Sequence, residues 1–517
     1  MKLFSLFLLL NLAEFGFGRN EAKLSRNEFP PGFVFGAGTS AYQQVEGAAA
    51  EDGRTPSVWD TFAHAGRSLD KSTGDVACDE YHKYKEDVQL MKMTHLDAYK
   101  FSISWSRLIP NGRGPVNLKG LQYYNNLINE LISHGIQPHI VLVHYDLPQA
   151  LEDEYEGWIS PKIVKDFKAY AEVCFREFGD RVLYWTTINE PNVLAIGGYD
   201  TANFPPARCS YPYGHNCTRG DSTLEPYIAA HNILLAHTAA ATIYKKKYQA
   251  KQQGFIGLNV FVYWFFPSTN SIEDINATQR AHDFYTGWFV NPLVFGDYPE
   301  TMRKIAGSKI PAFTKHQSEQ IMNSFDFFGI NHYSSVSVSD KPNSLKVEER
   351  DHEADMFAEL VVWRDGAPPG EFPTVPSGLR KTLEYFKQVY GNPPIYIHEN
   401  GFQARKDTLN DTDRVRYIEG FVGSLLDAVR NGSDARGYFV WSFMDLFELI
   451  GGYHNRFGLY HVDFDDKDLK RSPKLSAHWY SEFLKGGDEI SIEKTRGPPP
   501  TPHFLALGFH DMRSASL

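Results

Sequence analysis

The sequence lacks the features that mark several large classes of protein. Its 517 residues carry 63 acidic and 52 basic side chains, a net charge of −11, and no cluster of lysine and arginine that could follow a phosphate backbone. Nucleic acid is therefore not expected as a partner. No H-x-x-x-H or D-x-D-x-D spacing supplies the closely spaced ligands of a zinc or calcium site, so we expect no metal and no other cofactor.

Long apolar runs are scarce as well. One run, residues 3–12, follows Met1 and Lys2, is too short to span a bilayer and precedes small residues near position 18. This pattern predicts a signal peptide over residues 1–18 and entry into the secretory pathway. No later segment has the apolar length of a membrane span, and no K-D-E-L-type ending is present. The expected location is extracellular (the apoplast) or the vacuole; the oligomeric state stays open.

Cysteine is also rare, with four in the chain. Cys209 and Cys217 flank the short loop "CSYPYGHNC", in which proline and glycine turn the backbone, so they are the better disulfide pair in an oxidising compartment. The alternative is that both stay reduced. Cys78 and Cys174 are expected to be buried free thiols. Four N-x-S/T sequons fit the same secretory route as glycosylation sites: Asn216, Asn276, Asn410 and Asn431.

What the sequence does contain is an alternation of short apolar runs with longer amphipathic segments. Helical patterns such as 117–135 and 160–179 separate runs that are typical of buried parallel strands. The eight predicted strands are 33–38, 98–104, 139–144, 182–189, 255–260, 325–331, 394–399 and 437–442. Eight strands that alternate with helices predict an α/β fold, a single (β/α)₈ TIM barrel with long βα-loop insertions.

The chain shows no Pro/Ser-rich linker between residues 30 and 490. We therefore expect one catalytic barrel domain over 19–490, followed by a loose tail over 491–517. In such barrels the chemistry lies where the strands end, because eight loops converge there. Polar residues at the predicted strand ends are Gln43, Gln44, Arg107, His144, Asn189, Glu190, Asn331, Glu399 and Trp441.

Two carboxylates in this set, Glu190 in "TINEP" and Glu399 in "IHENG", each end an apolar strand. They are expected to face each other across the barrel mouth. At about 5 Å such a pair cleaves a glycosidic bond with retention through a covalent intermediate, whereas at about 7 to 9 Å it leaves room for water and inverts. The sequence alone leaves this separation open. A structural role for each carboxylate at a strand end is the alternative.

Five motifs, in order, resemble those of the glycoside hydrolase family 1 β-glucosidases, specifically the plant secretory branch. They are "FSISWSRLIP" (101–110), "HYDLPQAL" (144–151), "TINEPN" (187–192), "IHENG" (397–401) and "RFGLYHVDF" (456–464), and the resemblance runs from about residue 29 to 485. It implies a retaining barrel enzyme in which Glu190 is the general acid/base and Glu399 the nucleophile. Thioglucosidases of this family carry Gln at the acid/base position, so Glu190 favours O-β-glucosides.

The resemblance also implies sugar contacts. His144 and Asn189 match residues that bind hydroxyl groups, Tyr333 matches the phenol near the nucleophile, Trp441 the platform under the glucose ring and Glu448 the carboxylate that binds its outer hydroxyls. Phe457 is expected to close the pocket. For each of these, a structural role in the core is the alternative.

Three departures from the family pattern affect this site. The family has one Gln in "AYQVEG", but this chain has "AYQQVEG", so either Gln43 or Gln44 faces the sugar; we favour Gln44 and expect a local bulge to absorb the extra residue. Lys100 replaces an Arg beside the nucleophile, which keeps the charge but loses the planar fork. Leu449 replaces a Trp whose indole N–H would donate to the sugar, a loss of about 1 kcal/mol.

The sequence is compatible with three functions. The first is a retaining β-glucosidase that hydrolyses β-glucosides of plant secondary metabolites, with a small-molecule glucoside as its only expected partner. The second is a transglucosidase that passes glucose from an acyl-glucose or glucoside donor to a flavonoid-type acceptor, a reading that Lys100 and Leu449 favour. The third is a catalytically impaired carbohydrate-binding relative, which the Gln insertion keeps open. The sequence does not name the aglycone.

Overall fold

The computed structural model describes residues 24–45, 47–214, 216–361, 374–404 and 408–486. The expected signal peptide over 1–18 and the expected tail over 491–517 lie outside these ranges. Within them, no helix combines the length and the apolar character that a membrane crossing needs.

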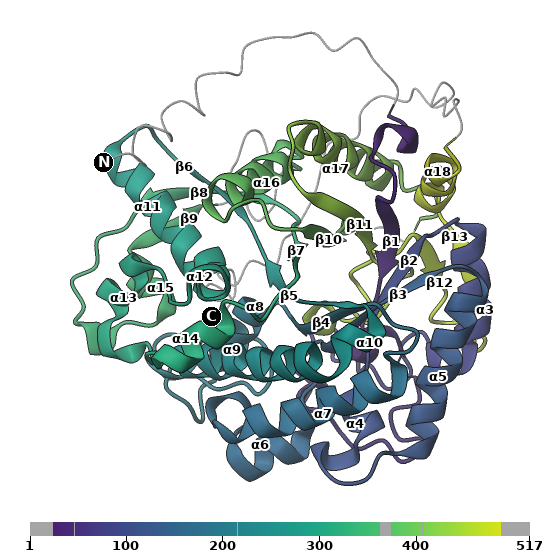
Figure 1. Cartoon of the computed structure of the whole chain (residues 1–517), viewed down its shortest axis with the longest axis horizontal. Helices are drawn as coiled ribbons and strands as arrows, with labels where there is room; N and C mark the ends of the chain where they lie inside the picture. Colours follow the sequence, from purple (N-terminus) through teal and green to yellow (C-terminus); the bar gives the residue numbers. More distant parts are fainter. Residues whose placement is uncertain (1–23, 46, 215, 362–373, 405–407, 487–517) are drawn as a thin grey trace.

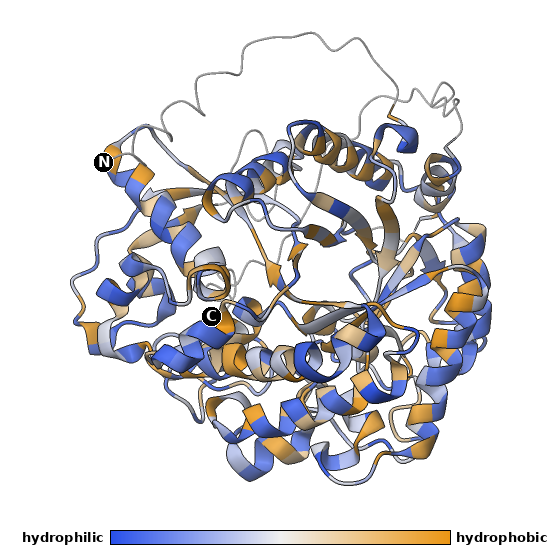
Figure 2. Ribbon diagram, in the orientation of Figure 1, coloured by the Kyte–Doolittle hydropathy of each residue, from blue (hydrophilic) through white to orange (hydrophobic). Residues whose placement is uncertain are grey.

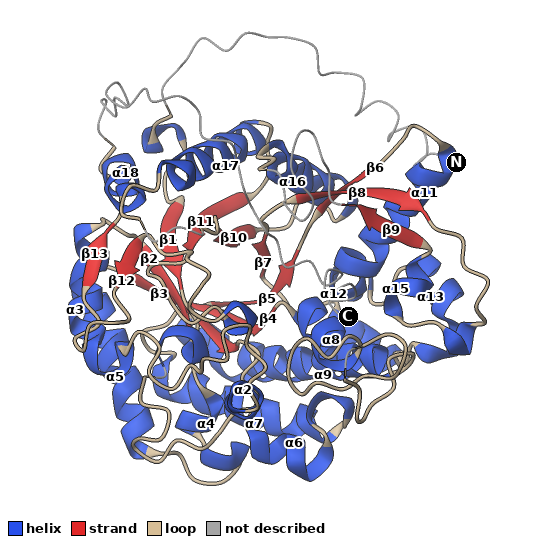
Figure 3. Ribbon diagram, turned by 180° about the vertical axis from the view of Figure 1, so that it is seen from behind, coloured by secondary structure: helices blue, strands red, loops and turns tan. Residues whose placement is uncertain are grey.

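Eight parallel strands close into a barrel at the centre of the molecule, surrounded by helices (Figures 1 and 3). Each predicted strand supplies one of them, with ends that differ by at most two residues. In chain order they are β1 (Val34–Gly38), β2 (Ala98–Ser102), β3 (Gln137–Val143), β4 (Tyr184–Asn189), β5 (Phe255–Phe261), β7 (Phe327–Asn331), β10 (Ile395–Asn400) and β11 (Ala435–Trp441). The predicted (β/α)₈ barrel is therefore confirmed.

Helices follow the strands and cover the outside of the barrel. They are α2 (Val58–His64), α3 (Glu80–Met93), α4 (Trp105–Leu108), α5 (Leu118–Ser133), α6 (Gln149–Tyr155), α7 (Lys162–Phe178), α8 (Pro191–Tyr199), α9 (Glu225–Ile243), α10 (Ala250–Gln252), α11 (Ile272–His282), α12 (Trp288–Phe295), α13 (Glu300–Ala306), α14 (Lys315–Ile321), α15 (His352–Met356), α16 (Ser377–Val389), α17 (Thr412–Arg430) and α18 (Leu475–Leu484).

The two helices predicted over 117–135 and 160–179 are α5 and α7. The side chain of Asn117 accepts a bond from the backbone of Lys119 to begin α5, and Gly135 just beyond its end has the left-handed φ of +75°. In α7 the buried residues recur at helical spacing, as in Ile163, Phe167 and Tyr170. Figure 2 shows the resulting mixture of hydrophobic and hydrophilic residues along the outer helices.

Aromatic side chains fill the inside of the barrel. Phe327, Tyr396 and Phe439 form a buried cluster, and the imidazole of His139 stacks on Tyr184 with ring centroids 4.3 Å apart. The barrel is therefore a packed core rather than a pore. These packed aromatic residues give rigid support to the side chains at the carboxyl ends of the strands.

In the part of the chain that the structure describes, two small sheets lie outside the barrel, and neither was predicted. One contains β6 (Trp264–Pro267), β8 (Ser335–Asp340) and β9 (Ala358–Val361), and the other pairs β12 (Tyr460–Val462) with β13 (Arg471–Pro473). β6 and β8 each follow a barrel strand after only a few residues. The apolar pattern therefore runs on from one strand to the next, and the sequence does not separate them.

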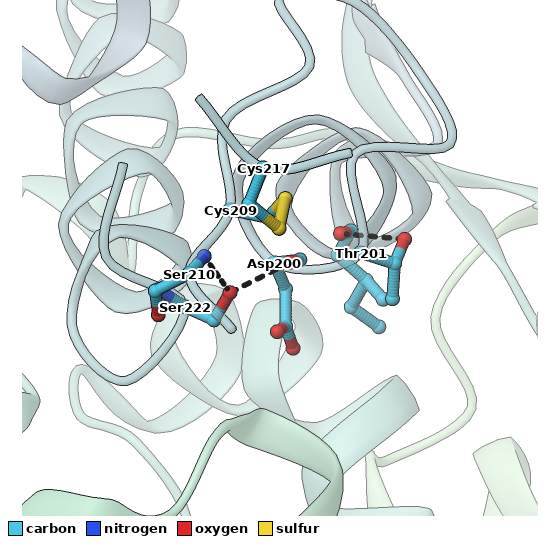
Figure 4. Close-up of a disulfide and its surroundings, with 7 residues drawn as sticks. Asp200, Thr201, Cys209, Ser210, Cys217 and Ser222 are labelled. Carbon is cyan, nitrogen blue, oxygen red and sulfur yellow. Dashed lines mark hydrogen bonds between the residues drawn. A yellow bond between two sulfur atoms is a disulfide. The ribbon is translucent and has the colours of Figure 1, made fainter. Parts of the chain in front are cut away.

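The predicted disulfide between Cys209 and Cys217 is present (Figure 4). Cys78 and Cys174 are buried free thiols, as predicted. The loop that carries the disulfide is also held by hydrogen bonds. Ser222 Oγ accepts from the Ser210 backbone at 2.9 Å and donates to the Asp200 carbonyl at 2.7 Å. The disulfide loop is thus fastened to the segment that follows α8.

This pairing predicts the thiol content of the purified protein. Alkylation of the unfolded protein without a reductant should modify two cysteines, Cys78 and Cys174, and prior reduction should raise the number to four. Peptide mass spectrometry measures both values. Modification of Cys209 or Cys217 before reduction would contradict the pairing, and a Cys209→Ser/Cys217→Ser variant gives the control in which reduction adds no label.

Candidate active site

Glu190 and Glu399 lie at the same end of the barrel, where β4 and β10 finish. Glu399 pairs in register with Asn331 at the end of β7, and the Glu190 backbone N–H donates to the Asn259 carbonyl on β5 at 2.8 Å. Glu190 has a left-handed φ of +43° and directly precedes α8, which starts with Pro191. Both carboxyl groups are buried, with 8% and 3% of the residue exposed for Glu190 and Glu399. The predicted meeting of the two carboxylates at one mouth is therefore observed.

Each oxygen of the Glu399 carboxylate has its own partner. Lys100 Nζ lies 2.5 Å from Oε1, and the Tyr333 hydroxyl donates to Oε2 at 2.7 Å. The side chain of Lys100 is fully buried. A buried ammonium group and a phenol therefore support the negative charge of the carboxylate that is expected to act as nucleophile.

The Glu190 carboxyl has a different environment. Asn331 donates to Oε1 at 2.7 Å, and the Tyr145 hydroxyl bonds to Oε2. Burial, followed by the nearby charge of Glu399, raises the pKa of Glu190 from 4.5 to about 8, against the opposing effect of these two hydrogen bonds. Glu190 therefore keeps its proton at neutral pH, which a general acid must do.

Asparagine side chains connect the two carboxyl groups. Asn189 Oδ1 accepts from Lys100 Nζ at 3.1 Å and from Asn331 Nδ2 at 3.4 Å, and it also accepts from Asn259. A hydrogen-bonded chain thus runs from Glu399 through Lys100, Asn189 and Asn331 to Glu190. A shift of one carboxyl group would disturb the other, so this chain fixes their relative position.

A second group of side chains forms one wall of the site. His144 stacks on Trp441 with ring centroids 5.7 Å apart, and its Nε2 lies 3.3 Å from the Asn189 amide. Burial raises the pKa of Glu448 to about 8, and hydrogen bonds from Trp441 and Gln43 oppose this increase. His144 Nδ1 and Glu448 Oε2 are buried and have no protein hydrogen-bond partner within the described residues. Such atoms are suited to bind the hydroxyl groups of a sugar.

The additional glutamine is absorbed in a π-helical turn, η2 (Ala41–Val45), and not in the bulge we expected. A π turn has i→i+5 hydrogen bonds and holds more residues than an α turn, so it can accommodate the additional glutamine. Gln43 is 1% exposed and accepts a hydrogen bond from Ser40 at 2.7 Å. Its contact with Glu448 places Gln43 in the wall of the site. The side chain of Gln44, which we favoured, lies outside the described residues.

Two of the remaining predicted residues lie near the site, and a third, Arg107, does not. Phe457 packs edge-on against Tyr333, with ring centroids 6.3 Å apart, and Leu449 is buried directly after Glu448. Arg107, which also follows a barrel strand, is buried in α4, where it stacks on Tyr81 and donates to the Ala48 carbonyl at 2.9 Å. Its role is therefore structural.

Three residues of the network were not predicted as site residues: Tyr145, Asn259 and Asn331. Asn331 ends a strand, and this position was its only signal. Asn259 lies within β5, and Tyr145 adjoins His144, where an aromatic residue looks like part of the core.

The family model for glycosyl hydrolase family 1 matches residues 25–488. This chain belongs to that family. It is 58% identical to β-glucosidase 22 of rice (Oryza sativa subsp. japonica), over 93% of this chain and 91% of the relative, and 56% identical to a cyanidin 3-O-glucoside 7-O-glucosyltransferase (acyl-glucose) of Delphinium grandiflorum, over 91% and 94%. The crystal structure of a rice β-glucosidase, Os3BGlu6, superimposes with a TM-score of 0.87 at 45% identity, and covers 89% of this chain and 100% of that one.

The ion pair predicts the effect of removing Lys100. Lys100→Met leaves the buried Glu399 carboxylate without its cation, so we expect a loss of about 3 to 5 kcal/mol in stability and a decrease of about 100-fold or more in kcat/KM on an aryl β-glucoside. Thermal unfolding and initial rates measure the two effects.

Lys309→Met is the matched control, because Lys309 forms a buried ion pair with Asp355. It should lower the stability but leave kcat/KM of the folded enzyme close to wild type. Full activity of Lys100→Met would contradict the role assigned to Lys100.

Proposed function

We propose that the protein is a retaining β-glucosidase that hydrolyses O-β-glucosides of plant secondary metabolites by double displacement. The observation that carries this proposal is the contrast between two buried carboxyl groups at one barrel mouth. Glu399 is paired with the Lys100 cation, whereas Glu190 keeps a proton because burial and Glu399 raise its pKa to about 8. A nucleophile and a general acid need these opposite protonation states.

In the first step a carboxylate oxygen of Glu399 attacks the anomeric carbon of the glucoside. The bond between that carbon and the glycosidic oxygen breaks, and its electron pair stays on the leaving oxygen, which takes the proton of Glu190. The products are the free aglycone and a glucosyl ester of Glu399. A mutant of the rice enzyme Os3BGlu6 has been solved in a covalent complex with Glc, which supports this intermediate for a family member.

In the second step the roles reverse. Esterification removes the negative charge of Glu399, which is the second largest cause of the raised pKa of Glu190, so the ionised form of Glu190 becomes more stable. Glu190 accepts a proton from water as the water oxygen attacks the anomeric carbon. The ester bond breaks, its electron pair returns to Glu399, and glucose leaves with the β configuration.

Transglucosylation is the second candidate, because the Delphinium relative at 56% identity is named for transfer from acyl-glucose. Transfer uses the same first step, and an acceptor hydroxyl then replaces water. Both carboxyl groups and their partners serve either reaction. The third hypothesis, a catalytically impaired carbohydrate-binding relative, has the least support, since Glu190, Glu399 and their polar partners are all in place.

Secretion and glycosylation remain part of the proposal. The apolar N-terminal run supports a signal peptide and delivery to the apoplast or the vacuole, and the disulfide is compatible with an oxidising compartment. The four sequon asparagines, Asn216, Asn276, Asn410 and Asn431, are all exposed, as a glycan requires.

Product analysis tests the proposed reaction. With an aryl β-glucoside, we expect free glucose and aryl alcohol in equal amounts, and NMR should detect β-glucose before mutarotation. Addition of a flavonoid or anthocyanin acceptor should leave free glucose as the main product. The Glu399→Gln variant should give no burst of aryl alcohol. A glucosylated acceptor without free glucose would establish transfer instead, and initial release of α-glucose would exclude retention.

The raised pKa of Glu190 predicts an alkaline limit of activity. Glu190 must be protonated in the first step, so kcat/KM for a phenyl β-glucoside should stay high through neutral pH and fall as the pH rises through about 8. A Glu190→Gln variant assayed on 2,4-dinitrophenyl β-glucoside, whose leaving group needs no proton, is the control and should lack this limb. A wild-type limb near the ordinary carboxyl pKa of 4.5 would contradict the assignment.

A further inference from the structure

Tyr145 touches the general acid, although nothing in the sequence marked it as functional. It follows His144 just after β3, and its hydroxyl bonds to Oε2 of Glu190. Both residues have left-handed backbones, with φ of +70° at Tyr145 and +43° at Glu190. This conformation is unfavourable for residues other than glycine and persists only where the surrounding structure enforces it. Here it turns two side chains from separate strand ends toward each other.

Packing fixes the ring of Tyr145 in this position. The residue is 3% exposed, and its ring makes edge-on contacts with Phe204 and His144 at centroid distances of 5.2 and 5.0 Å. Burial and the charge of Glu190 hold the pKa of the phenol well above its ordinary value of 10. The hydroxyl therefore keeps its own proton whenever the enzyme is active.

The two oxygens of the Glu190 carboxyl differ in what their partners can do. Oε1 accepts a hydrogen bond from the amide N–H of Asn331, which can only donate. A proton on Oε1 would therefore point at another donor, which is unfavourable. Oε2 faces the Tyr145 hydroxyl, which donates or accepts. The acidic proton of Glu190 therefore belongs on Oε2, beside Tyr145.

We propose that Tyr145 is a positioning residue for the general acid/base, an inference that rests on the proposed function. In the structure the Tyr145 hydroxyl is placed as the donor to Oε2 of Glu190. When Oε2 carries the proton of neutral Glu190, the same bond runs in the opposite direction, and the hydroxyl accepts that proton until the substrate binds. When the Oε2–H bond breaks and the proton passes to the leaving oxygen, the Tyr145 hydroxyl rotates and donates to the new anion. Tyr145 keeps its own proton throughout, so it stabilises the charge that develops on Glu190 without entering the proton transfer.

The leaving group of the substrate provides the test. Tyr145→Phe should lower kcat/KM for phenyl β-glucoside by about 10-fold or more, the effect of a lost hydrogen bond to a charged group, and change kcat/KM for 2,4-dinitrophenyl β-glucoside by less than about 2-fold, because that leaving group needs no acid. The alkaline limb for phenyl β-glucoside should move to higher pH, because the lost bond stabilised the anion and lowered the pKa of Glu190.

The second step gives an independent readout. With 2,4-dinitrophenyl β-glucoside, where the second step limits turnover, kcat of Tyr145→Phe should not fall, because the lost bond stabilised the Glu190 anion that acts as the base, and its loss leaves Glu190 the stronger base toward water. In a Glu190→Gln background the change Tyr145→Phe should have no further effect on either substrate, since Tyr145 is proposed to act only through Glu190.

Tyr199→Phe is the matched control. Tyr199 is a buried tyrosine on α8, the helix that begins next to Glu190, and its hydroxyl accepts from the Trp158 backbone at 3.2 Å. It should leave both substrates and the pH profile close to wild type. An equal loss on both substrates in Tyr145→Phe, an unchanged alkaline limb, or a further loss in the Glu190→Gln background would overturn the proposal. An inactive wild type would instead contradict the proposed function.

Discussion

The site depends on the ion pair between Lys100 and Glu399. Three carboxyl groups lie near one another: Glu190 and Glu399 are buried, and Glu448 is partly buried with its Oε2 shielded from solvent. Lys100 is bonded to Glu399. Burial penalises a charge that lacks a partner. The pKa values of Glu190 and Glu448 accordingly rise to about 8, with the charge of Glu399 as the next cause after burial. Of these three glutamates, Glu399 is the one bonded to Lys100, so the three carboxyl groups have different electrostatic environments.

The barrel is what keeps this arrangement fixed. Lys100 lies inside β2, and its ammonium group reaches Glu399 on β10. The buried cluster of Ala98, Phe327, Tyr396 and Phe439 fills the barrel interior. Asn189 ends β4 and accepts from the same ammonium group. Side chains that project from rigid strands lose little freedom when the substrate binds, so the charges are already in place when the reaction begins.

The sequence predicted the eight barrel strands because strands buried on both faces form continuous apolar runs. It also predicted Glu190 and Glu399, since a carboxylate that ends such a run is unusual. It did not predict the π turn over Ala41–Val45, because one extra residue fits several local conformations. Tyr145 stayed hidden for a related reason. The left-handed backbone of Tyr145 sets the direction of its side chain, and a pattern of apolar residues does not predict the conformation of a single residue.

Hydrolysis and transfer share the glucosyl ester of Glu399, so the two reactions diverge only when water or an acceptor hydroxyl reaches the anomeric carbon. Glu190 accepts a proton from either one, and Lys100 and Asn331 are bonded to side chains of the site itself, those of Glu399, Asn189 and Glu190. The choice must therefore lie in side chains at the mouth. Tyr333 and Phe457, which pack edge-on beside Glu399 and stay half-buried, belong to that boundary. An aromatic acceptor that stacks on Tyr333 and Phe457 would displace water from the glucosyl ester. When no acceptor is bound there, water remains the nucleophile.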